Sequence, residues 1–311
     1  MRRINVKTVM WQLTGAGDPT RRGEPLFGIA MIFPAVCGLA LFQFLPMLSA
    51  AVSSVRRFNP FTKRATGWAG IDNFSAVLSD PSFHSAMLVT VAYVILSLLL
   101  MLPLSLGLAM LLDRRVPGTF LARAAVLGAL AASESVSALI WNQMYLPNNG
   151  LFSAILNAIG LSGQPFLTSA WQSIPSIIAI SAWKDIGLPM LIFLGGLQAI
   201  PPHLYEAAAI DGASPWPTFR RITLPMLQPS LILASFMITV GAVRLFTPIY
   251  LLTEGGPNGA TTNIAYYAYV QNFHFSSPGH ASASVIVMLI VLALIGGAQV
   301  VLLRSKKRIA P

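Results

Sequence analysis

Six long apolar runs constrain the fold of this chain more strongly than any other feature of its sequence. They lie at about residues 26–55, 82–112, 119–145, 171–197, 224–252 and 281–303. A helix needs about 20 mostly apolar residues to cross a lipid bilayer, and each run is long enough. Several runs contain proline, which membrane helices tolerate because neighbouring helices and water satisfy the freed backbone groups. The sequence therefore predicts an all-α membrane protein with six transmembrane helices.

The scarcity of charge supports the same fold class. Of the 311 residues, 55% are hydrophobic and only 10% are charged, whereas soluble globular domains carry about 25% charged residues. So few charges cannot cover a water-facing surface. This excludes an ordinary cytosolic enzyme, a disordered chain and a nucleic-acid-binding protein. The single cysteine, Cys37, excludes a disulfide framework and a cysteine-rich metal site.

The formal charge of +10 predicts how the chain is oriented, because cytoplasmic segments of membrane proteins carry an excess of Lys and Arg. If the N-terminus is cytoplasmic, four of the 20 basic residues lie outside: Arg56, Arg57, Lys63 and Arg64. Fourteen lie inside, namely Arg2, Arg3, Lys7, Arg21, Arg22, Arg114, Arg115, Arg123, Arg220, Arg221, Arg304, Lys306, Lys307 and Arg308. We therefore expect a cytoplasmic segment at 1–25, a transmembrane domain at 26–303 and a cytoplasmic basic tail at 304–311.

The chain lacks the sequence motifs of catalysis. It has no Gly-x-x-x-x-Gly-Lys-Ser/Thr phosphate loop, no Gly-x-Ser-x-Gly elbow and no paired-carboxylate motif. The four histidines (His84, His203, His274 and His280) do not have the spacing of metal ligands. We expect no catalytic residue, no metal site and no cofactor bound by this chain.

The segment 201–225, PPHLYEAAAIDGASPWPTFRRITLP, predicts a short helix between the fourth and fifth runs. Two prolines precede it, at positions where a missing backbone N–H costs nothing. Glu206 suits the positive end of the helix dipole. Gly212 is placed to end the helix, and Pro215 and Pro217 prevent its continuation. By itself this pattern also fits an ordinary connecting loop.

The same segment resembles the EAA loop of binding-protein-dependent ABC importer permeases. The resemblance rests on Glu206-Ala207-Ala208, on Gly212 and on Ile222-x-Leu224-Pro225, each at the spacing of that motif. Outer segments similar to the carbohydrate-uptake branch are 68–74 (WAGIDNF), 150–160, 253–262 (TEGGPNGATT) and 279–285. One departure is Phe246-Thr247, where that branch usually has Phe-Asp, so nothing is carried over for that aspartate.

This resemblance implies a type I ABC importer permease fold, with a cytoplasmic coupling helix in the loop 201–222. Such a chain forms half of the translocation pathway for a sugar, an oligosaccharide or a glycerol-phosphate derivative, and it is not an enzyme. The implied partners are a second homologous permease subunit, two cytoplasmic ATP-binding subunits that use ATP and Mg, and an extracytoplasmic substrate-binding protein. The implied location is the inner membrane of a bacterium or archaeon. The implied ATPase-coupling residues are Glu206, Ala207, Ala208, Gly212, Ile222, Leu224 and Pro225.

Charged residues inside the apolar runs predict a polar pathway. They are Glu134, Lys184, Asp185 and Arg244. A charge near the bilayer centre costs at least about 2.5–3.5 kcal/mol, so it should face protein or water. Together with Trp141, Asn142 and Trp183, they would suit a sugar, which presents hydroxyl groups and apolar ring faces. The alternative is interhelical pairing, of Glu134 with Lys184 or with Arg244, that holds the helices together. Their mixed signs do not decide between a neutral sugar and a phosphate-bearing substrate.

Other membrane functions remain as alternatives. An ion-coupled secondary transporter of a small polar solute would usually contain inverted repeats; we see none, and the coupling loop would then lack a purpose. An intramembrane enzyme would need clustered catalytic residues. A purely structural subunit would not explain charges at membrane depth.

Overall fold

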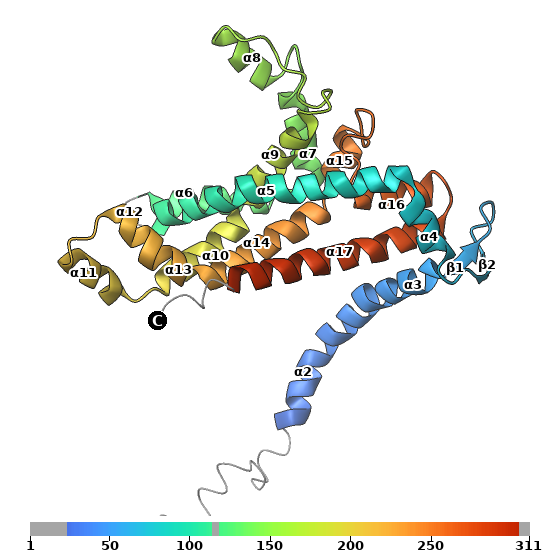
Figure 1. Cartoon of the computed structure of the whole chain (residues 1–311), viewed down its shortest axis with the longest axis horizontal. Coiled ribbons are helices and arrows are strands. Elements are labelled where there is room, and N and C mark those ends of the chain that lie inside the picture. Colours follow the sequence, from blue (N-terminus) through green and yellow to red (C-terminus); the bar gives the residue numbers. More distant parts are fainter. Residues whose placement is uncertain (1–23, 114–117, 305–311) are drawn as a thin grey trace, which may run out of the picture. The chain divides into compact units, whose positions relative to one another are not determined.

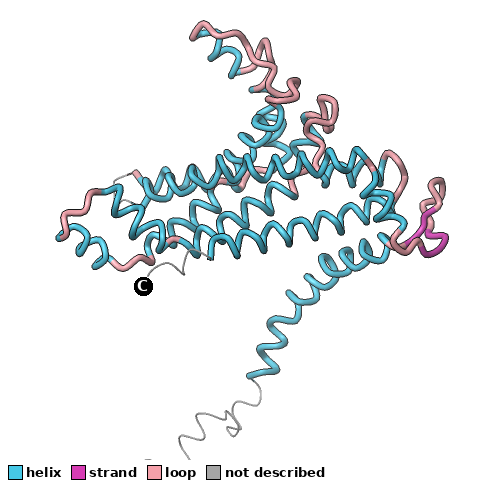
Figure 2. Tube along the Cα trace, viewed as in Figure 1, coloured by secondary structure: helices cyan, strands magenta, loops and turns pink. Residues whose placement is uncertain are grey.

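The computed structural model describes residues 24–113 and 118–304, most of which are helical (Figure 2). Residues up to Val52 form one compact unit and residues from Ser53 onward form a second. The predicted cytoplasmic segment at 1–25 and the basic tail at 304–311 lie almost wholly outside the described residues. The prediction of an all-α membrane protein is confirmed.

The described part of the first unit is a long apolar helix with a distortion near its middle. It comprises α2 (Glu24–Leu39), a π-helical turn η2 (Ala40–Phe44) and α3 (Leu45–Ser54). Its 25 residues from Ala30 to Ser54 are long and apolar enough to cross a membrane. Pro46 explains the π-helical turn, since its ring would clash with the Phe42 carbonyl in a regular helix.

A small hairpin opens the second unit. Strands β1 (Arg56–Phe58) and β2 (Ala65–Trp68) pair antiparallel, and helix α4 (Asp72–Ser79) follows. Arg57 donates to Asp72 at 2.7 Å, which ties the hairpin to α4. The buried Asn73 side chain donates to the carbonyl oxygens of Ser54 at 2.8 Å and Arg56 at 2.9 Å.

Helix α5 (Pro81–Asp113) is the centre of the second unit. It packs against α14 (Gln228–Val243), α10 (Gly187–Gln198), α9 (Ser173–Asp185) and α16 (Ile264–Phe273). Figure 1 shows α5, α14 and α17 (Pro278–Arg304) side by side along the bundle. The buried residues of α5 recur every three or four positions, as one buried helix face requires: Phe83, Ala86, Thr90, Tyr93, Val94, Ser97, Met101, Ser105, Ala109 and Leu112.

The third apolar run is not one straight helix, so the prediction of a continuous span at 119–145 is wrong. It forms α6 (Thr119–Leu130) and α7 (Glu134–Met144), bent by 101°. Ser133 has extended backbone angles, φ −61° and ψ 136°, which start a new helix rather than continue the old one. Hydropathy averaged over a run cannot reveal such a break.

The fourth and fifth runs are broken as well, each within four residues before a proline. Helices α9 and α10 are bent by 53° at Ile186. Helix α14 ends at Val243, and α15 (Thr247–Leu252) begins three residues after Arg244. Pro189 and Pro248 lack a backbone N–H for the carbonyls of Asp185 and Arg244, and their rings clash with those carbonyls. Four helices, or up to six if each bent pair counts as one, can therefore cross a membrane within the described chain.

The remaining elements connect these spans. Helix α8 (Leu151–Ala158) lies in the loop after α7. Between α10 and α14 the chain forms α11 (Pro202–Ile210), α12 (Pro215–Thr218), the π-helical turn η3 (Phe219–Thr223) and α13 (Leu224–Met226). Figure 1 places α11 and α12 at the opposite end of the second unit from the β1–β2 hairpin.

Candidate substrate cavity and coupling loop

The four charged residues predicted within the spans line one cavity of about 370 Å³. The charged wall consists of Glu134 on α7, Lys184 and Asp185 on α9, and Arg244 after α14. The remainder of the lining is mostly apolar, with hydroxyl groups from Ser97 and Ser181. The complete lining is Ser97, Met101, Leu130, Glu134, Ser181, Lys184, Asp185, Leu188, Pro189, Met237, Ile238, Val240, Gly241, Ala242, Arg244 and Leu245.

The helix breaks place these charges at helix ends that suit their signs. Glu134 is in the first turn of α7, where the helix dipole favours a negative charge. Lys184 is in the last turn of α9 and Arg244 caps the C-terminus of α14, where a positive charge is favoured. The broken spans therefore carry the charges to the cavity and stabilise them there.

The ion pairing within the cavity leaves two charges free. Lys184 Nζ lies 3.0 Å from Asp185 Oδ1, and their side chains are 16% and 50% exposed. Across residues 24–113 and 118–304, neither Glu134 nor Arg244 has an ion-pair or hydrogen-bonded side-chain partner, and both are exposed. The alternative pairing of Glu134 with Lys184 or with Arg244 is therefore not formed in this structure.

The predicted aromatic residues lie together beside the charged wall. The rings of Trp141 and Trp183 are 6.0 Å apart. Trp141 also contacts Tyr145 and Phe152, at 5.5 and 5.6 Å, and Phe166 extends the cluster. This cluster joins α7, α8 and α9. Neither tryptophan is part of the cavity wall itself.

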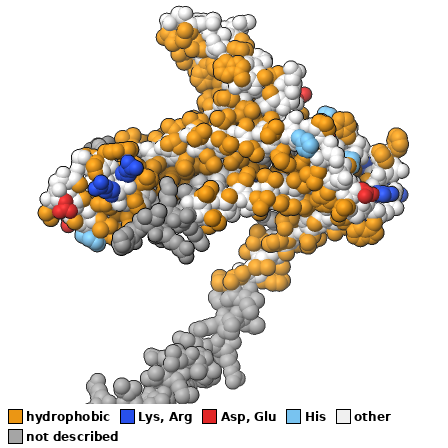
Figure 3. Space-filling model, in the orientation of Figure 1, with side chains coloured by type: hydrophobic (Ala, Val, Ile, Leu, Met, Phe, Trp, Pro, Cys, Tyr) orange, Lys and Arg blue, Asp and Glu red, His pale blue; other side chains and the backbone are white. Residues whose placement is uncertain are grey.

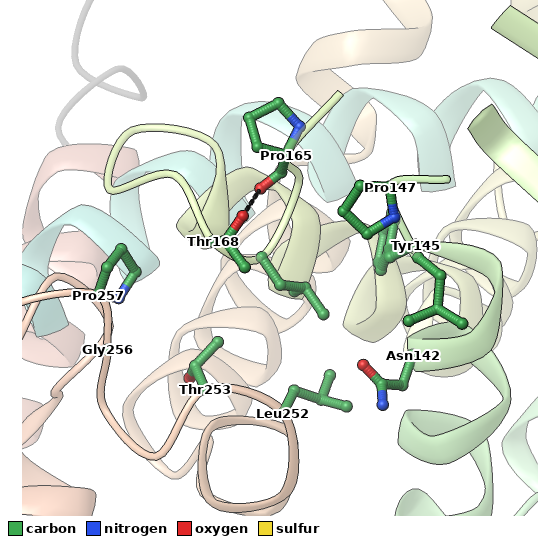
Figure 4. Close-up of a pocket in the computed structure, with 11 residues that line it drawn as sticks. Asn142, Tyr145, Pro147, Pro165, Thr168, Leu252, Thr253, Gly256 and Pro257 are labelled. Atoms are coloured by element: carbon green, nitrogen blue, oxygen red, sulfur yellow. Dashed lines mark hydrogen bonds between the residues drawn. The ribbon is translucent and has the colours of Figure 1, made fainter. Parts of the chain in front are cut away.

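Asn142 lies apart from the charged cavity, in a second pocket of about 330 Å³. This pocket lies between the end of α7, the segment 165–168 and the loop after α15. Figure 4 shows the Asn142 side chain facing Leu252 of α15. The loop after α15, which forms one side of this pocket, is closely packed. Gly255 in this loop has φ +81°, and a Cβ atom there would collide with Thr262 and Tyr266. The seven residues predicted to share one pathway thus occupy two pockets and an aromatic cluster.

Sequence reasoning missed the cavity serines and Tyr145. Ser97 and Ser181 lie inside apolar runs, and their polarity is hidden when the run is averaged. Tyr145 is buried and donates to the Ser176 carbonyl at 2.9 Å. Its only signal in the sequence is a polar aromatic residue at the end of the third run.

The coupling loop forms the predicted short helix, but the prediction that Glu206 lies at its positive end is wrong, because the first turn of α11 contains no acidic residue. Helix α11 starts at Pro202 and ends in a Schellman motif: Gly212 N–H donates to Ala209 O at 3.1 Å, and Ala213 N–H to Ala208 O at 2.9 Å. Gly212 has φ +69°, a conformation that L side chains rarely adopt. The predicted ending at Gly212 is confirmed.

The predicted coupling residues differ in exposure. Glu206, Ala207, Gly212 and Pro225 are exposed, Ile222 and Leu224 are partly buried, and Ala208 is buried. Beside them, Ile210 is 86% exposed and presents an apolar side chain to solvent. The hydroxyl groups of Tyr205 and Thr223 lie 3.1 Å apart and join α11 to η3. This contact links α11 to the segment that leads into the fifth span.

Known proteins are similar to the chain over most of its length. Residues 83–309 match the family described as binding-protein-dependent transport system inner membrane component. The trehalose/maltose transport system permease protein MalF of Thermococcus litoralis is 37% identical over 271 residues, covering 87% of this chain and 91% of MalF. The sn-glycerol-3-phosphate transport system permease protein UgpA of Agrobacterium fabrum is 35% identical over 269 residues, covering 85% of this chain and 90% of UgpA.

A solved structure supports the same fold. A chain of a bacterial ABC transporter involved in the import of the acidic polysaccharide alginate matches with a TM-score of 0.76 at 25% identity. The match covers 94% of this chain and 98% of that chain.

Proposed function

The chain belongs to the family of binding-protein-dependent transport system inner membrane components, and on that premise we propose that it forms half of an ATP-driven import pathway for a saccharide. It is a non-catalytic, multi-pass permease subunit with the type I importer fold. Family membership argues against the ion-coupled secondary transporter that the sequence left open. The second half of the pathway would come from a homologous permease subunit.

The observation that carries the proposal is the cavity at the helix breaks. Its volume of about 370 Å³ falls in the range of small-molecule sites, roughly 300–1,000 Å³. Lys184 and Asp185 neutralise each other, so Glu134 and Arg244 remain to bind a ligand. A carboxylate that accepts and a guanidinium that donates suit the hydroxyl groups of an uncharged sugar. Trp141 and Trp183 lie beside this cavity without lining it.

The unpaired Arg244 favours a second candidate, a glycerol-phosphate derivative. A guanidinium matches the geometry of a phosphate group and can donate two parallel hydrogen bonds to it. Glu134 in the same cavity would repel that phosphate, whereas Lys184 and Asp185 neutralise each other. The balance of charge therefore favours the neutral sugar as the first substrate to test.

The coupling partners follow from α11. We infer that Glu206, Ala207, Ala208 and Gly212 dock in a cleft of a cytoplasmic ATPase subunit, with Ile222, Leu224 and Pro225 transmitting the movement to the fifth span. ATP and Mg would bind to two such ATPase subunits, and this chain would bind no cofactor. An extracytoplasmic binding protein would deliver the substrate. Both termini and α11 would then lie in the cytoplasm.

The test is ATP hydrolysis by the complete transporter in lipid. The chain is purified with its partner permease and ATPase subunits, and candidate saccharides or glycerophosphodiesters are added with the binding protein. We expect substrate to stimulate hydrolysis and Gly212→Asp to reduce that stimulation at least tenfold. Gly160→Asp is the matched control, since Gly160 has φ +80° and equally open surroundings at the end of α8. A chain that transports under an ion gradient without any ATPase would refute the proposal.

A further inference from the structure

A pocket outside the substrate cavity lies within the coupling loop, in the part that follows α11. Its volume is about 460 Å³, and it is lined by Trp216, Pro217, Arg220 and Arg221. These residues come from α12 and the following π-helical turn η3. In Figure 3, Lys and Arg side chains gather over the end of the molecule that carries α11 and α12. The pocket therefore presents two adjacent guanidinium groups next to an indole ring.

The two arginines have no anion to neutralise them. Both are exposed, and in the part of the chain that the structure describes neither has a hydrogen-bonded or ion-paired partner. Neither α12 nor η3 contains an acidic residue. Two neighbouring guanidinium groups repel each other, so an anion bound between them would relieve that repulsion.

Beside the two arginines, the pocket is lined by the indole ring of Trp216, which is held in place by a neighbouring ring. Trp216 stacks on Phe219, with ring centroids 5.7 Å apart and an angle of 26° between the planes. The indole nonetheless remains 68% exposed. Tryptophan is enriched at membrane–water interfaces, where its apolar body meets acyl chains and its N–H meets headgroups. The combination fits a ligand that carries both a phosphate group and an apolar part.

We propose that this pocket binds the phosphate group of an anionic phospholipid in the cytoplasmic leaflet. The proposal rests on the proposed function in one respect, since that function places α12 at the cytoplasmic face. Arginine binds phosphate through two parallel hydrogen bonds, and anionic lipids attract basic residues at this leaflet. A soluble phosphate ester presents the same chemistry without the acyl chains, and the experiment separates the two sources.

The position of the pocket links this lipid to coupling. The turn η3 carries both arginines and ends at Thr223, whose hydroxyl lies 3.1 Å from that of Tyr205 on α11. A headgroup held by Arg220 and Arg221 would restrain η3, and through Tyr205 it would restrain α11. Anionic lipid is therefore expected to strengthen the coupling of ATP hydrolysis to substrate.

The experiment measures lipid retained by the complete purified transporter. Wild type and Arg220→Gln/Arg221→Gln are exchanged into mixed phosphatidylglycerol and phosphatidylcholine, and bound lipid is counted by native mass spectrometry. We expect the double variant to retain at least tenfold less phosphatidylglycerol at this site, with phosphatidylcholine unchanged. Arg56→Gln/Arg64→Gln is the matched control, because both residues are exposed on the β1–β2 hairpin. Arg220→Lys/Arg221→Lys should retain an intermediate amount.

Three outcomes would overturn the proposal. Equal phosphatidylglycerol retention in wild type and the glutamine variant would show that the arginines do not hold the lipid. Loss of the ATPase subunits with unchanged lipid would assign the arginines to subunit docking. Displacement of the lipid by millimolar inorganic phosphate or sn-glycerol 3-phosphate would assign the pocket to a soluble phosphate ester. Failure of the proposed function gives a different result, since substrate would then not stimulate hydrolysis by wild type in any lipid.

Discussion

At the residue scale, the unpaired charges of Glu134 and Arg244 are the most informative feature of the cavity. A hydrogen bond to a charged group contributes about 1.5–3 kcal/mol, roughly a 10- to 100-fold change in an equilibrium constant. We therefore expect Glu134→Gln and Arg244→Gln each to reduce uptake of the saccharide at least tenfold, measured with radiolabelled substrate in proteoliposomes. Arg64→Gln, on the exposed hairpin, is the control and should transport normally. Normal uptake by both cavity variants would place the substrate elsewhere.

A second residue-scale prediction concerns the hydroxyl pair of Tyr205 and Thr223. Their contact at 3.1 Å is a side-chain hydrogen bond that joins α11 to η3. A neutral hydrogen bond contributes about 0.5–1.5 kcal/mol, so Tyr205→Phe is expected to lower substrate-stimulated hydrolysis by roughly two- to tenfold. Unstimulated hydrolysis should not change, because the ATPase subunits are intact. The ratio of the two rates, with and without substrate, is the measurement that decides.

At the element scale, Asp80 connects two helices that are distant in sequence. Its carboxylate accepts from Tyr267 on α16 at 2.6 Å and from the Ser82 backbone at 2.8 Å, at the start of α5. Burial raises the pKa of the Asp80 carboxyl, but the hydrogen bonds from Tyr267 and Ser82 outweigh it and lower the pKa below the ordinary 3.8. The stabilisation is therefore complete above pH 3.8 and is lost as pH falls through the lower, folded-state value.

This linkage predicts how Asp80→Asn depends on pH. The melting temperature of the purified variant should lie below that of wild type at neutral pH. The difference should be constant above pH 3.8 and should shrink as pH falls below 3.8 toward the lower folded-state pKa, because the stabilisation by the wild-type carboxylate is lost over that interval. Thermal unfolding at a series of pH values measures it. A melting-temperature difference that stays constant with pH would show that the negative charge of Asp80 does not contribute to stability.

The positions of the spans follow from the sequence, whereas their breaks do not. Hydropathy located every run because it depends only on how many apolar residues are contiguous. The breaks at Ile186 and Arg244 had a local signal in Pro189 and Pro248, three and four residues later, which averaging over a run conceals. The bend at Ser133 has no proline to mark it in the sequence. The same limit applies to the site: the charges were predicted, but Asn142 lies in a separate pocket because α7 starts in a new direction.

At the scale of the whole molecule, the distribution of basic residues makes a prediction about sidedness. The hairpin should face the outside and α11 the cytoplasm, since this orientation puts 14 of the 20 basic residues in cytoplasmic segments. With Cys37 replaced by Ser, Lys63→Cys should react with a membrane-impermeant thiol reagent in intact cells. His203→Cys should react only after the membrane is permeabilised. Both positions are exposed in the structure, so a difference in labelling would reflect the membrane and not burial within the protein. The reverse pattern would invert the orientation.

The three helix breaks also bear on the fate of a chain that has not yet assembled. Residues beside each break, namely Leu130, Glu134, Asp185, Leu188, Arg244 and Leu245, line the same cavity. Non-helical backbone at membrane depth persists only where protein or water covers it, because each unsatisfied group in hydrocarbon costs several kcal/mol. A lone copy of the chain therefore has one face that acyl chains cannot solvate. In cells that lack its partner, we expect this orphan subunit to be degraded by membrane proteases, so its abundance would report assembly.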